Sequence, residues 1–301
     1  MLSAPRRAAA WFYGRAYLLL GLTMLMWGGN AVAGRLAVGH VSPMALTALR
    51  WSLPFALLVI VQRGPLLAHR GALLARWPAI LLMGALGFTA FNALFYLAAH
   101  HTSAVNIAIL QGSIPVLVLV GALLVHGVPI RGVQVAGMAA TLIGAALVAC
   151  RGDPAALLTL AFNVGDLWML LACLFYAGYT LGLRTRPAVP GLVFFTAMAG
   201  VALVTALPLL ALEVASGAVI WPSAQGWLIV LYVALAPSFA SQVFFIRAVE
   251  LIGPGRAGLF VNLVPVFGAL LAVLVLGEPF AAYHGLALAL VLGGIWLAER
   301  R

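Results

Sequence analysis

The chain has 301 residues, of which 65% are hydrophobic and only 7% charged, and its formal net charge is +10. This composition excludes a water-soluble domain and is typical of a membrane protein. It also argues against a nucleic-acid-binding protein, because too little of the surface would face water to carry a basic patch.

Ten apolar segments follow one another and predict an all-α integral membrane protein with ten transmembrane helices. Each segment is close to the roughly 20 residues that a helix needs to cross the hydrocarbon core. We place the spans at residues 17–38, 43–62, 76–99, 102–125, 129–150, 166–184, 190–212, 226–250, 255–276 and 280–298. The first span is too long for a signal peptide and is expected to be retained, although Arg6, Arg7 and Arg15 precede it.

The arginines predict the orientation of these spans. All 16 basic residues are arginine. With a cytoplasmic N-terminus, only Arg35 and Arg151 would lie outside, and Arg50 and Arg247 fall inside spans. Positive residues are retained on the cytoplasmic side. We therefore expect a multi-pass protein of a bacterial cytoplasmic (inner) membrane with both termini cytoplasmic, in contact with the lipid bilayer.

The sequence repeats itself at an offset of 150 residues. At this shift Pro115, Gly127, Pro129 and Gly144 coincide with Pro265, Gly277, Pro279 and Gly294. At a shift of 149, residues 22–35 overlay 171–184, so that Trp27 meets Tyr176. We predict a first five-helix repeat at residues 1–150 and a second at 151–301. Because five is odd, the second repeat enters the membrane from the opposite side, and such inverted repeats are typical of secondary transporters.

Three stretches resemble the EamA-type branch of the drug/metabolite transporter superfamily. They are LRW at 49–51, SIPVLVLVGALLVHGVP at 113–129 and NLVPVFGALLAVLVLGEP at 262–279. The first half departs from the family pattern at Val128, where the family often has Glu. Within this branch the chain is most similar to bacterial aromatic amino acid exporters of the YddG type. The resemblance implies a ten-helix transporter that exports small metabolites.

Polar and aromatic residues inside the spans predict a central substrate site. In inverted repeats the site lies near the midplane between the halves, and polar groups face the protein interior. In this chain the polar residues within spans fall mainly on spans 1, 3, 4, 6, 8 and 9, three spans in each half. The predicted substrate-binding residues are Trp27, Asn30, Asn92, Tyr96, Gln111, Ser113, Tyr176, Tyr179, Ser241, Gln242, Phe244 and Asn262. The alternative is that each polar group only bonds to a neighbouring helix.

The aromatic content of this set narrows the substrate. Aromatic rings with neutral amides and hydroxyls suit a neutral or zwitterionic solute with an apolar side group. We expect export of aromatic or other bulky apolar amino acids. Alternatives are nucleobases or organic cations as substrates, or, from other classes, a channel or a membrane-embedded enzyme. No catalytic motif, cofactor or metal-ligand pattern is present, so no enzymatic activity is predicted.

Charged residues in or near the spans bear on energy coupling. No acid lies well inside a span, which favours uniport or exchange over proton coupling. Arg50 could attract a substrate carboxylate, but the favoured interpretation is that it bonds backbone carbonyls and extends its charge outward. His100 and His101 are interpreted as interfacial histidines. The small residues Gly285, Ala289 and Gly293 could seat a homodimer or only a neighbouring helix.

Overall fold

The structure is a computed structural model that describes residues 11–153 and 163–299. Arg6, Arg7, Arg300 and Arg301, which contribute to the predicted orientation, lie outside the described residues. So do residues 154–162, which follow the predicted start of the second repeat.

All ten predicted spans are helical, because a backbone in lipid must satisfy its hydrogen bonds internally. Among the described residues nine helices are long and apolar enough to cross a membrane, and Ala282–Ala298 is a shorter apolar helix. The first half comprises α2 (Ala16–Ala37), α3 (Pro43–Leu74), α4 (Trp77–Gly84), the π-helix η1 (Ala85–Ala90), α5 (Phe91–Ala99), α6 (Ala104–Gln111), α7 (Ile114–His126) and α8 (Gly132–Ala149). The second half comprises α10 (Val164–Gly182), the short 3-10 helix η2 (Leu183–Thr185), α11 (Gly191–Ala215), α12 (Ala224–Val233), the π-helix η3 (Ala234–Ala240), α13 (Ser241–Ile252), α14 (Pro254–Val261), α15 (Val264–Leu276) and α16 (Ala282–Glu299).

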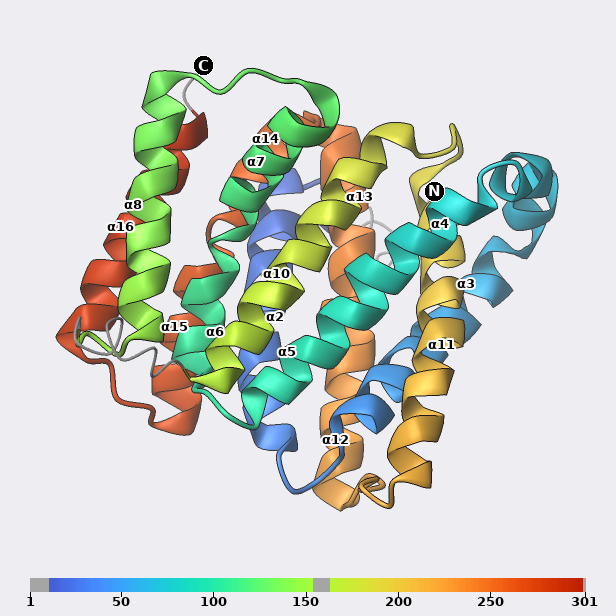
Figure 1. The fold of residues 1–301 in the computed structure, drawn as a ribbon. Helices are drawn as coiled ribbons and strands as arrows, with labels where there is room; N and C mark the ends of the chain where they lie inside the picture. The colour runs from blue at the N-terminus through green and yellow to red at the C-terminus, as the bar shows by residue number, and fades with distance from the viewer. Residues whose placement is uncertain (1–10, 154–162, 300–301) are drawn as a thin grey trace.

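Helix α3 is longer than the predicted second span, which was placed at residues 43–62. It continues to Leu74 and contains Pro54 and Pro65 in its interior. Arg63 and Arg70, which fall between the predicted second and third spans, are therefore helical and exposed. The added turns project to the right of the bundle in Figure 1. Hydrophobicity marks where a helix leaves the apolar layer, whereas residues beyond that layer can extend the helix without any apolar signal.

Four spans are interrupted, and the interruptions recur at equivalent places in the two halves. The π-helical segments η1 and η3 break the third and eighth spans. Turns at residues 112–113 and 262–263 break the fourth and ninth. These two spans end at Gly127 and Gly277, whose φ angles of 64° and 66° are left-handed, a conformation that glycine adopts without a Cβ clash. The sequence offset of 150 thus recurs as an offset in backbone geometry.

Helices α8 and α16 are equivalent in the two halves and pack against each other in opposite directions (Figure 1). A Cβ at Gly137 would lie 2.4 Å from the carbonyl oxygen of Gly294, and one at Gly144 would lie 2.8 Å from that of Ala287. Gly137 of α8 thus meets Gly294 of α16, whereas the later residue Gly144 meets the earlier residue Ala287. Gly144 and Gly294 occupy equivalent positions in the two halves. The pair is therefore close-packed and antiparallel. Ala289 and Gly293 lie exposed, away from α8.

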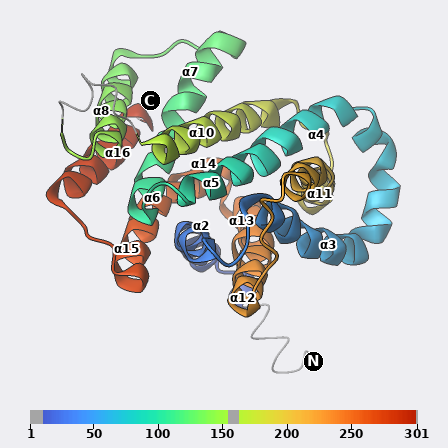
Figure 2. The same ribbon diagram turned by 60° about the horizontal axis from the view of Figure 1, so that its bottom comes forward.

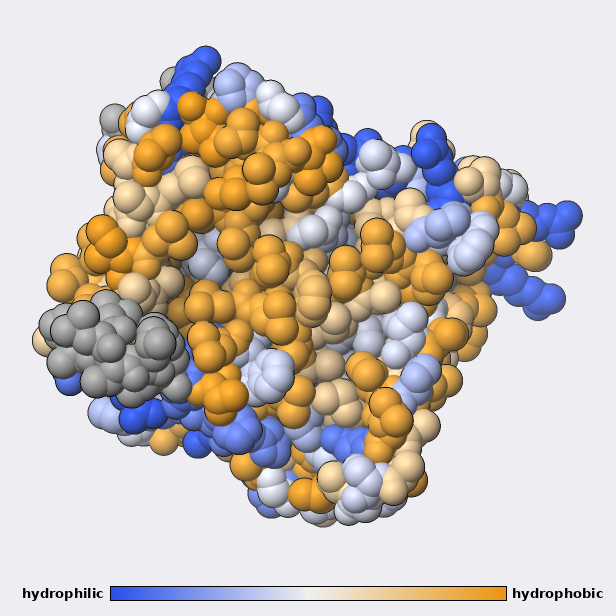
Figure 3. Space-filling view, in the orientation of Figure 1, coloured by the Kyte–Doolittle hydropathy of each residue, from blue (hydrophilic) through white to orange (hydrophobic). Residues whose placement is uncertain are grey.

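The helices form one bundle whose sides are apolar. Figure 3 shows hydrophobic residues over the side of the bundle and hydrophilic ones mainly at its two ends, as a membrane-spanning protein requires. We call the end formed by residues 38–42, 100–103, 216–223 and 277–281 the lower end, because it lies at the bottom of Figure 1. Figure 2, turned toward that end, shows α5 and α10 side by side, with α2 and α13 between α15 and α3.

Candidate functional site

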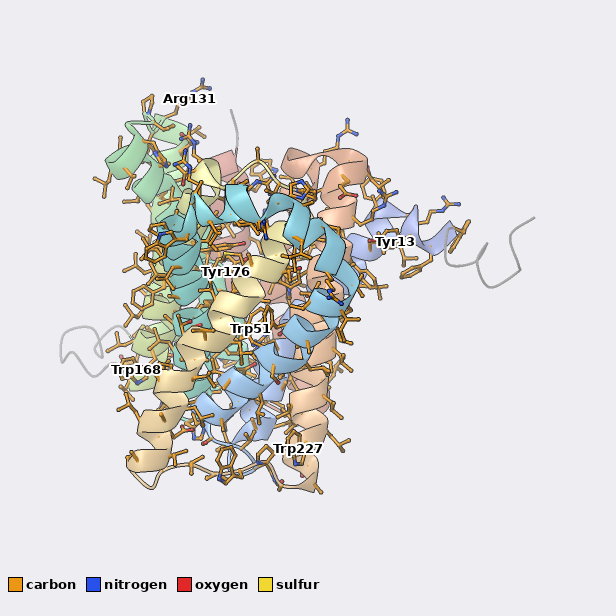
Figure 4. All side chains as sticks on the ribbon, turned by 90° about the vertical axis from the view of Figure 1, so that its right-hand side faces the viewer. Tyr13, Trp51, Arg131, Trp168, Tyr176 and Trp227 are labelled. Carbon is orange, nitrogen blue, oxygen red and sulfur yellow. The ribbon has the colours of Figure 1, made fainter. Side chains whose placement is uncertain are left out.

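A cavity of about 100 Å³ lies inside the bundle, between elements of both halves. Its walls come from α2, α3, η1, α5, α6 and α7 of the first half, and from α10, η3, α13, α14 and α15 of the second. The residues that line it are Trp27, Asn30, Arg50, Trp51, Gly87, Phe88, Phe91, Asn92, Gln111, Ile114, Tyr176, Pro237, Gln242, Val261 and Val264. Trp51 and Tyr176 lie at intermediate heights of the bundle, between Arg131 at one end and Trp227 near the other (Figure 4).

A larger groove of about 390 Å³ lies between α2, α12 and α15. Gln225 and Tyr232 are the polar side chains in its lining, which otherwise consists of Gly, Ala, Val, Leu and Ile. Such a surface suits lipid tails. We therefore take the smaller, more polar cavity as the candidate site.

Arg50 is the centre of the polar wall of this cavity. Its side chain is only 4% exposed and bonds to side chains of η3, α5 and α2, the last through a 3.4 Å hydrogen bond from Nη1 to Asn30 Oδ1. Nε and Nη2 donate to Ser238 Oγ over 2.9 and 2.6 Å. Nη1 donates to Asn92 Oδ1 and to Tyr96 Oη, each over 2.5 Å. All of these acceptors are neutral, so they satisfy N–H groups without balancing the charge.

The π-helical segments position two of these acceptors. Asn92 is the second residue after η1, and Ser238 lies within η3. A π-turn shifts the register of the helix and changes where side chains and carbonyls point, so it is common at functional sites. In η3 it also leaves the carbonyl oxygen of Pro237 to accept a 3.2 Å hydrogen bond from Trp27 Nε1.

Aromatic rings form much of the rest of the wall. Trp51 stacks on Phe88 with ring centroids 4.7 Å apart and an interplanar angle of 7°. The ring centroids of Phe91 and Tyr176 lie 5.0 Å apart, with their planes tilted by 52°. The indole Nε1 of Trp51 is buried and has no hydrogen-bond partner among the described residues. The cavity thus offers flat apolar surfaces beside a cationic group and a spare N–H donor.

The structure brings seven of the twelve predicted site residues together. Six of them line the cavity: Trp27, Asn30, Asn92, Gln111, Tyr176 and Gln242. The seventh, Tyr96, lies behind the wall, where its hydroxyl donates to Asn30 Oδ1 over 3.0 Å and accepts from Arg50. Whether any of them binds a substrate stays a prediction.

The other five predicted residues do not line the cavity. Ser113 and Asn262 lie at the breaks of the fourth and ninth spans. Ser241 donates to the Pro237 carbonyl one turn before it, over 2.6 Å. Tyr179 packs on Phe88 and Tyr176. Phe244 packs edge-to-face on Phe12, on another side of α13. The helical phase placed these residues near the cavity, but the breaks and π-turns rotate the faces of the spans that carry Ser113, Ser241, Phe244 and Asn262. Tyr179 lies on the uninterrupted helix α10, and its ring packs against Phe88 without lining the cavity.

The favoured interpretation of Arg50 was wrong. It neither bonds backbone carbonyls nor extends its charge outward, since each of its hydrogen-bond partners is a side chain and it is buried. The position of Arg50 deep in a span could have predicted its environment, because a buried arginine needs hydrogen-bond acceptors on the helices that face it. Trp51, Phe88 and Ile114 also line the cavity but had no such signal, being ordinary apolar residues of membrane helices.

A second buried polar cluster lies near the lower end. Asp166, in the first turn of α10, is fully buried and accepts a 2.6 Å hydrogen bond from the Thr102 hydroxyl at Oδ1. Asn106 Nδ2 lies 3.4 Å from the same oxygen. His284 Nδ1 accepts from the Ala281 backbone N–H, so its Nε2 donates to Asn106 Oδ1 over 3.2 Å. Asp166 Oδ2 has no partner among the described residues.

Two glutamates of the second half bind helix N-termini of the first half at the same end. Glu213 accepts from the backbone N–H groups of Met44 and Ala45, at the start of α3. Glu278 accepts from those of Ala104 and Val105, at the start of α6, each over 3.0 Å. A carboxylate at a helix N-terminus is stabilised by unpaired N–H groups and the helix dipole. The lower end is therefore held by polar contacts between the two halves.

His100 and His101 lie at the lower end, where we expected interfacial histidines. Burial lowers the pKa of His100, the nearby Arg35 and His101 lower it further, and the Glu213 carboxylate raises it by less. The net shift favours the neutral imidazole.

The model of the EamA-like transporter family matches the chain twice, at residues 14–150 and 163–299. The chain belongs to this family. It is therefore a membrane transporter, built from two EamA domains, and not an enzyme. The two matches correspond to the two sets of equivalent helices described above.

Two relatives from Bacillus subtilis (strain 168) are similar over nearly the whole chain. The uncharacterized transporter YyaM is 26% identical over 94% of this chain and 92% of its own length. The uncharacterized transporter YetK is 22% identical over 94% of this chain and 86% of its own length. A solved crystal structure of a protein superimposes with a TM-score of 0.65 at 22% identity, covering 94% of this chain and 96% of the other. This last likeness shows the fold alone.

Proposed function

We propose that this transporter exports aromatic or other bulky apolar amino acids by alternating access of the central cavity, through uniport or exchange. The observation that carries the proposal is the composition of the cavity wall. Trp27, Trp51, Phe88, Phe91 and Tyr176 supply flat surfaces. Asn30, Asn92, Gln111 and Gln242 supply neutral donors and acceptors among them.

This wall matches an amino acid better than the alternative solutes. An aromatic side chain would replace water against the rings, and the amides could bond an ammonium group or an amide-like edge. An organic cation would meet the positive charge of Arg50 at close range without an acid in the lining to offset it. A drug-cation substrate is therefore disfavoured.

Alternating access requires that the two halves separate at one end of the cavity at a time. The lower end is joined by the hydrogen bonds of Asp166, Glu213 and Glu278 to residues of the first half. We infer that opening toward the lower side breaks these contacts. The arginine distribution supports an orientation in which the lower side faces the outside of a bacterial cytoplasmic membrane and both termini are cytoplasmic.

Counterflow in liposomes tests the substrate class. We expect purified protein to exchange labelled phenylalanine or tryptophan across the membrane, with competition from other aromatic amino acids but not from nucleobases or sugars. Trp27→Ala should reduce this exchange, whereas Trp227→Ala, an exposed tryptophan near the lower end, should not. Flux of nucleobases or organic cations with no flux of amino acids would refute the proposal.

A further inference from the structure

We propose that Arg50 and Trp51 form an anchoring site for the carboxylate of the substrate, and that this site makes the transporter select carboxylates over amines. This inference rests on the proposed function and names the group that the cavity recognises. Arg50 and Trp51 are adjacent on α3, and both line the cavity. Trp51 Nε1 has no hydrogen-bond partner among the described residues, and Arg50 has one more N–H group than its hydrogen bonds use.

The first part of the argument is the charge of Arg50. Its hydrogen-bond partners among the described residues are all neutral side chains, and it takes no part in the ion pairs that join Arg35 to Glu278 and Arg247 to Glu250. A guanidinium stays protonated in proteins, so it has no neutral form to adopt when it is buried. A buried charge without a counter-charge is costly. The simplest way to balance it is an anion that enters the cavity.

The second part is the number of donors that remain. Arg50 has five N–H groups. One on Nε and one on Nη2 reach Ser238, and the two on Nη1 reach Asn92 and Tyr96, with Asn30 Oδ1 as a more distant acceptor at 3.4 Å from Nη1. One Nη2 hydrogen is left over. The Trp51 indole contributes a second unused N–H, and the guanidinium carbon lies 5.4 Å from the centre of its ring. A carboxylate has two oxygens, so it can accept a hydrogen bond from the spare Arg50 N–H and another from the Trp51 N–H.

The third part is the rigidity of the anchor. Ser238 from η3, Asn92 from α5 and Tyr96 from α5 fix the guanidinium from two sides, and Phe88 fixes the indole by stacking. Groups held in place before binding lose little entropy when the ligand arrives. The anchor therefore needs no rearrangement to bind a carboxylate, and the aromatic wall next to it receives the side chain.

The anchor also gives a reason why the charge of Arg50 lies where the two halves of the protein meet. Arg50 belongs to the first half, whereas Ser238, which takes two of its hydrogen bonds, belongs to the second. A bound carboxylate would add negative charge at a point where the two halves meet. Its affinity for the anchor would then differ between conformations in which Arg50 and Ser238 are together or apart, and such a difference is what lets a ligand shift the balance between two states.

A series of phenylalanine analogues tests the anchor by direct binding. The ligands are phenylalanine, 3-phenylpropionate, which lacks the amine, and phenethylamine, which lacks the carboxylate. The readout is the shift in thermal unfolding temperature of the detergent-purified protein, which needs no transport. We expect phenylalanine and 3-phenylpropionate to stabilise the protein and phenethylamine not to do so. Equal stabilisation by phenethylamine would overturn the proposal.

Two variants and one control test whether Arg50 and Trp51 are the residues that bind the carboxylate. Arg50→Met should lose the stabilisation by 3-phenylpropionate. Trp51→Phe keeps the ring stacked on Phe88 and removes only the N–H, so it should weaken binding of 3-phenylpropionate about tenfold. Arg70→Met removes an exposed arginine of the same helix and should bind like the wild type. If Trp51→Phe folds and binds unchanged, the indole has no part in the anchor; if a folded Arg50→Met also binds unchanged, the anchor does not exist.

The outcomes separate this inference from the proposed function. Binding of 3-phenylpropionate that depends on Arg50, without counterflow of any amino acid, would support the anchor and refute the amino acid substrate. If the protein shows counterflow of phenylalanine and phenethylamine inhibits it as strongly as unlabelled phenylalanine does, the amino acid substrate is supported and the anchor is refuted.

Discussion

Arg50 and Asp166 are both buried charged residues without an ionic partner among the described residues, yet their surroundings differ. Arg50 lines a cavity, and neutral oxygens take four of its five N–H groups. Asp166 is enclosed near the lower end, and only one of its oxygens has partners. The arginine keeps its charge, so an anion that enters the cavity is needed to balance it, whereas an aspartate can be neutralised by binding a proton. We therefore assign Arg50 to ligand binding and Asp166 to the contact between the two halves.

The largest expected effect separates these two roles directly. Arg50→Met should abolish counterflow of phenylalanine, because the carboxylate loses its counter-charge. Asp166→Asn should leave counterflow measurable, because the amide oxygen still accepts from Thr102 and Asn106. Counterflow by the two variants in liposomes of matched protein content is the measurement. Loss of transport in Asp166→Asn with retention in Arg50→Met would reverse the assignment.

Removal of the acceptor that holds Arg50 should have the next largest effect. Ser238→Ala leaves the Nε and Nη2 hydrogens that bond Ser238 without their acceptor, and a lost bond to a charged group costs about 1.5–3 kcal/mol. We expect the affinity for phenylalanine to fall about tenfold or more. Ser241→Ala is the matched control, because that hydroxyl only bonds the Pro237 carbonyl of its own helix. An equal loss in both variants would show that the Ser238 contact is not specific.

Thr102 tests the Asp166 side of the comparison through stability. Thr102→Val removes the shorter of the two donors to Asp166 Oδ1, so we expect the free energy of unfolding to fall by about 1–2 kcal/mol. Thr180→Val is the control, because the Thr180 hydroxyl bonds the Tyr176 carbonyl one turn before it in the same helix. Thermal unfolding in detergent measures both. Counterflow by Thr102→Val should persist, in contrast with Arg50→Met.

The smallest expected effect compares two acids at the lower end. Glu278→Gln replaces a carboxylate that binds two backbone N–H groups, and loss of its charge at a helix N-terminus should cost about 1 kcal/mol. Asp166→Asn should leave stability unchanged or raise it, because it removes an incompletely bonded charge. The difference in unfolding temperature is the measurement. A larger loss for Asp166→Asn would show that its ionised form is stabilised by contacts other than those described above.

The ten spans and the repeat could be predicted because both leave a direct record in the sequence. Hydrophobic length marks a span, and the glycines at 127 and 277 recur because each ends its helix in a left-handed conformation. The site was predicted only in part. Asn92 and Gln242 were found from helical phase, but Phe244 and Ser241 were placed wrongly relative to the cavity because the π-turn of η3 lies just before them.

By itself, the sequence determined that this protein crosses a membrane many times in two related halves, since the hydrocarbon layer sets the length and polarity of each span. The tertiary structure alone decided which buried polar groups meet. Arg50, Asn92 and Ser238 are far apart in the chain, and only the packing of α3 against α5 and η3 shows that the arginine is bonded but not neutralised. Charge balance in an apolar interior depends on distance in space, which residue order does not specify.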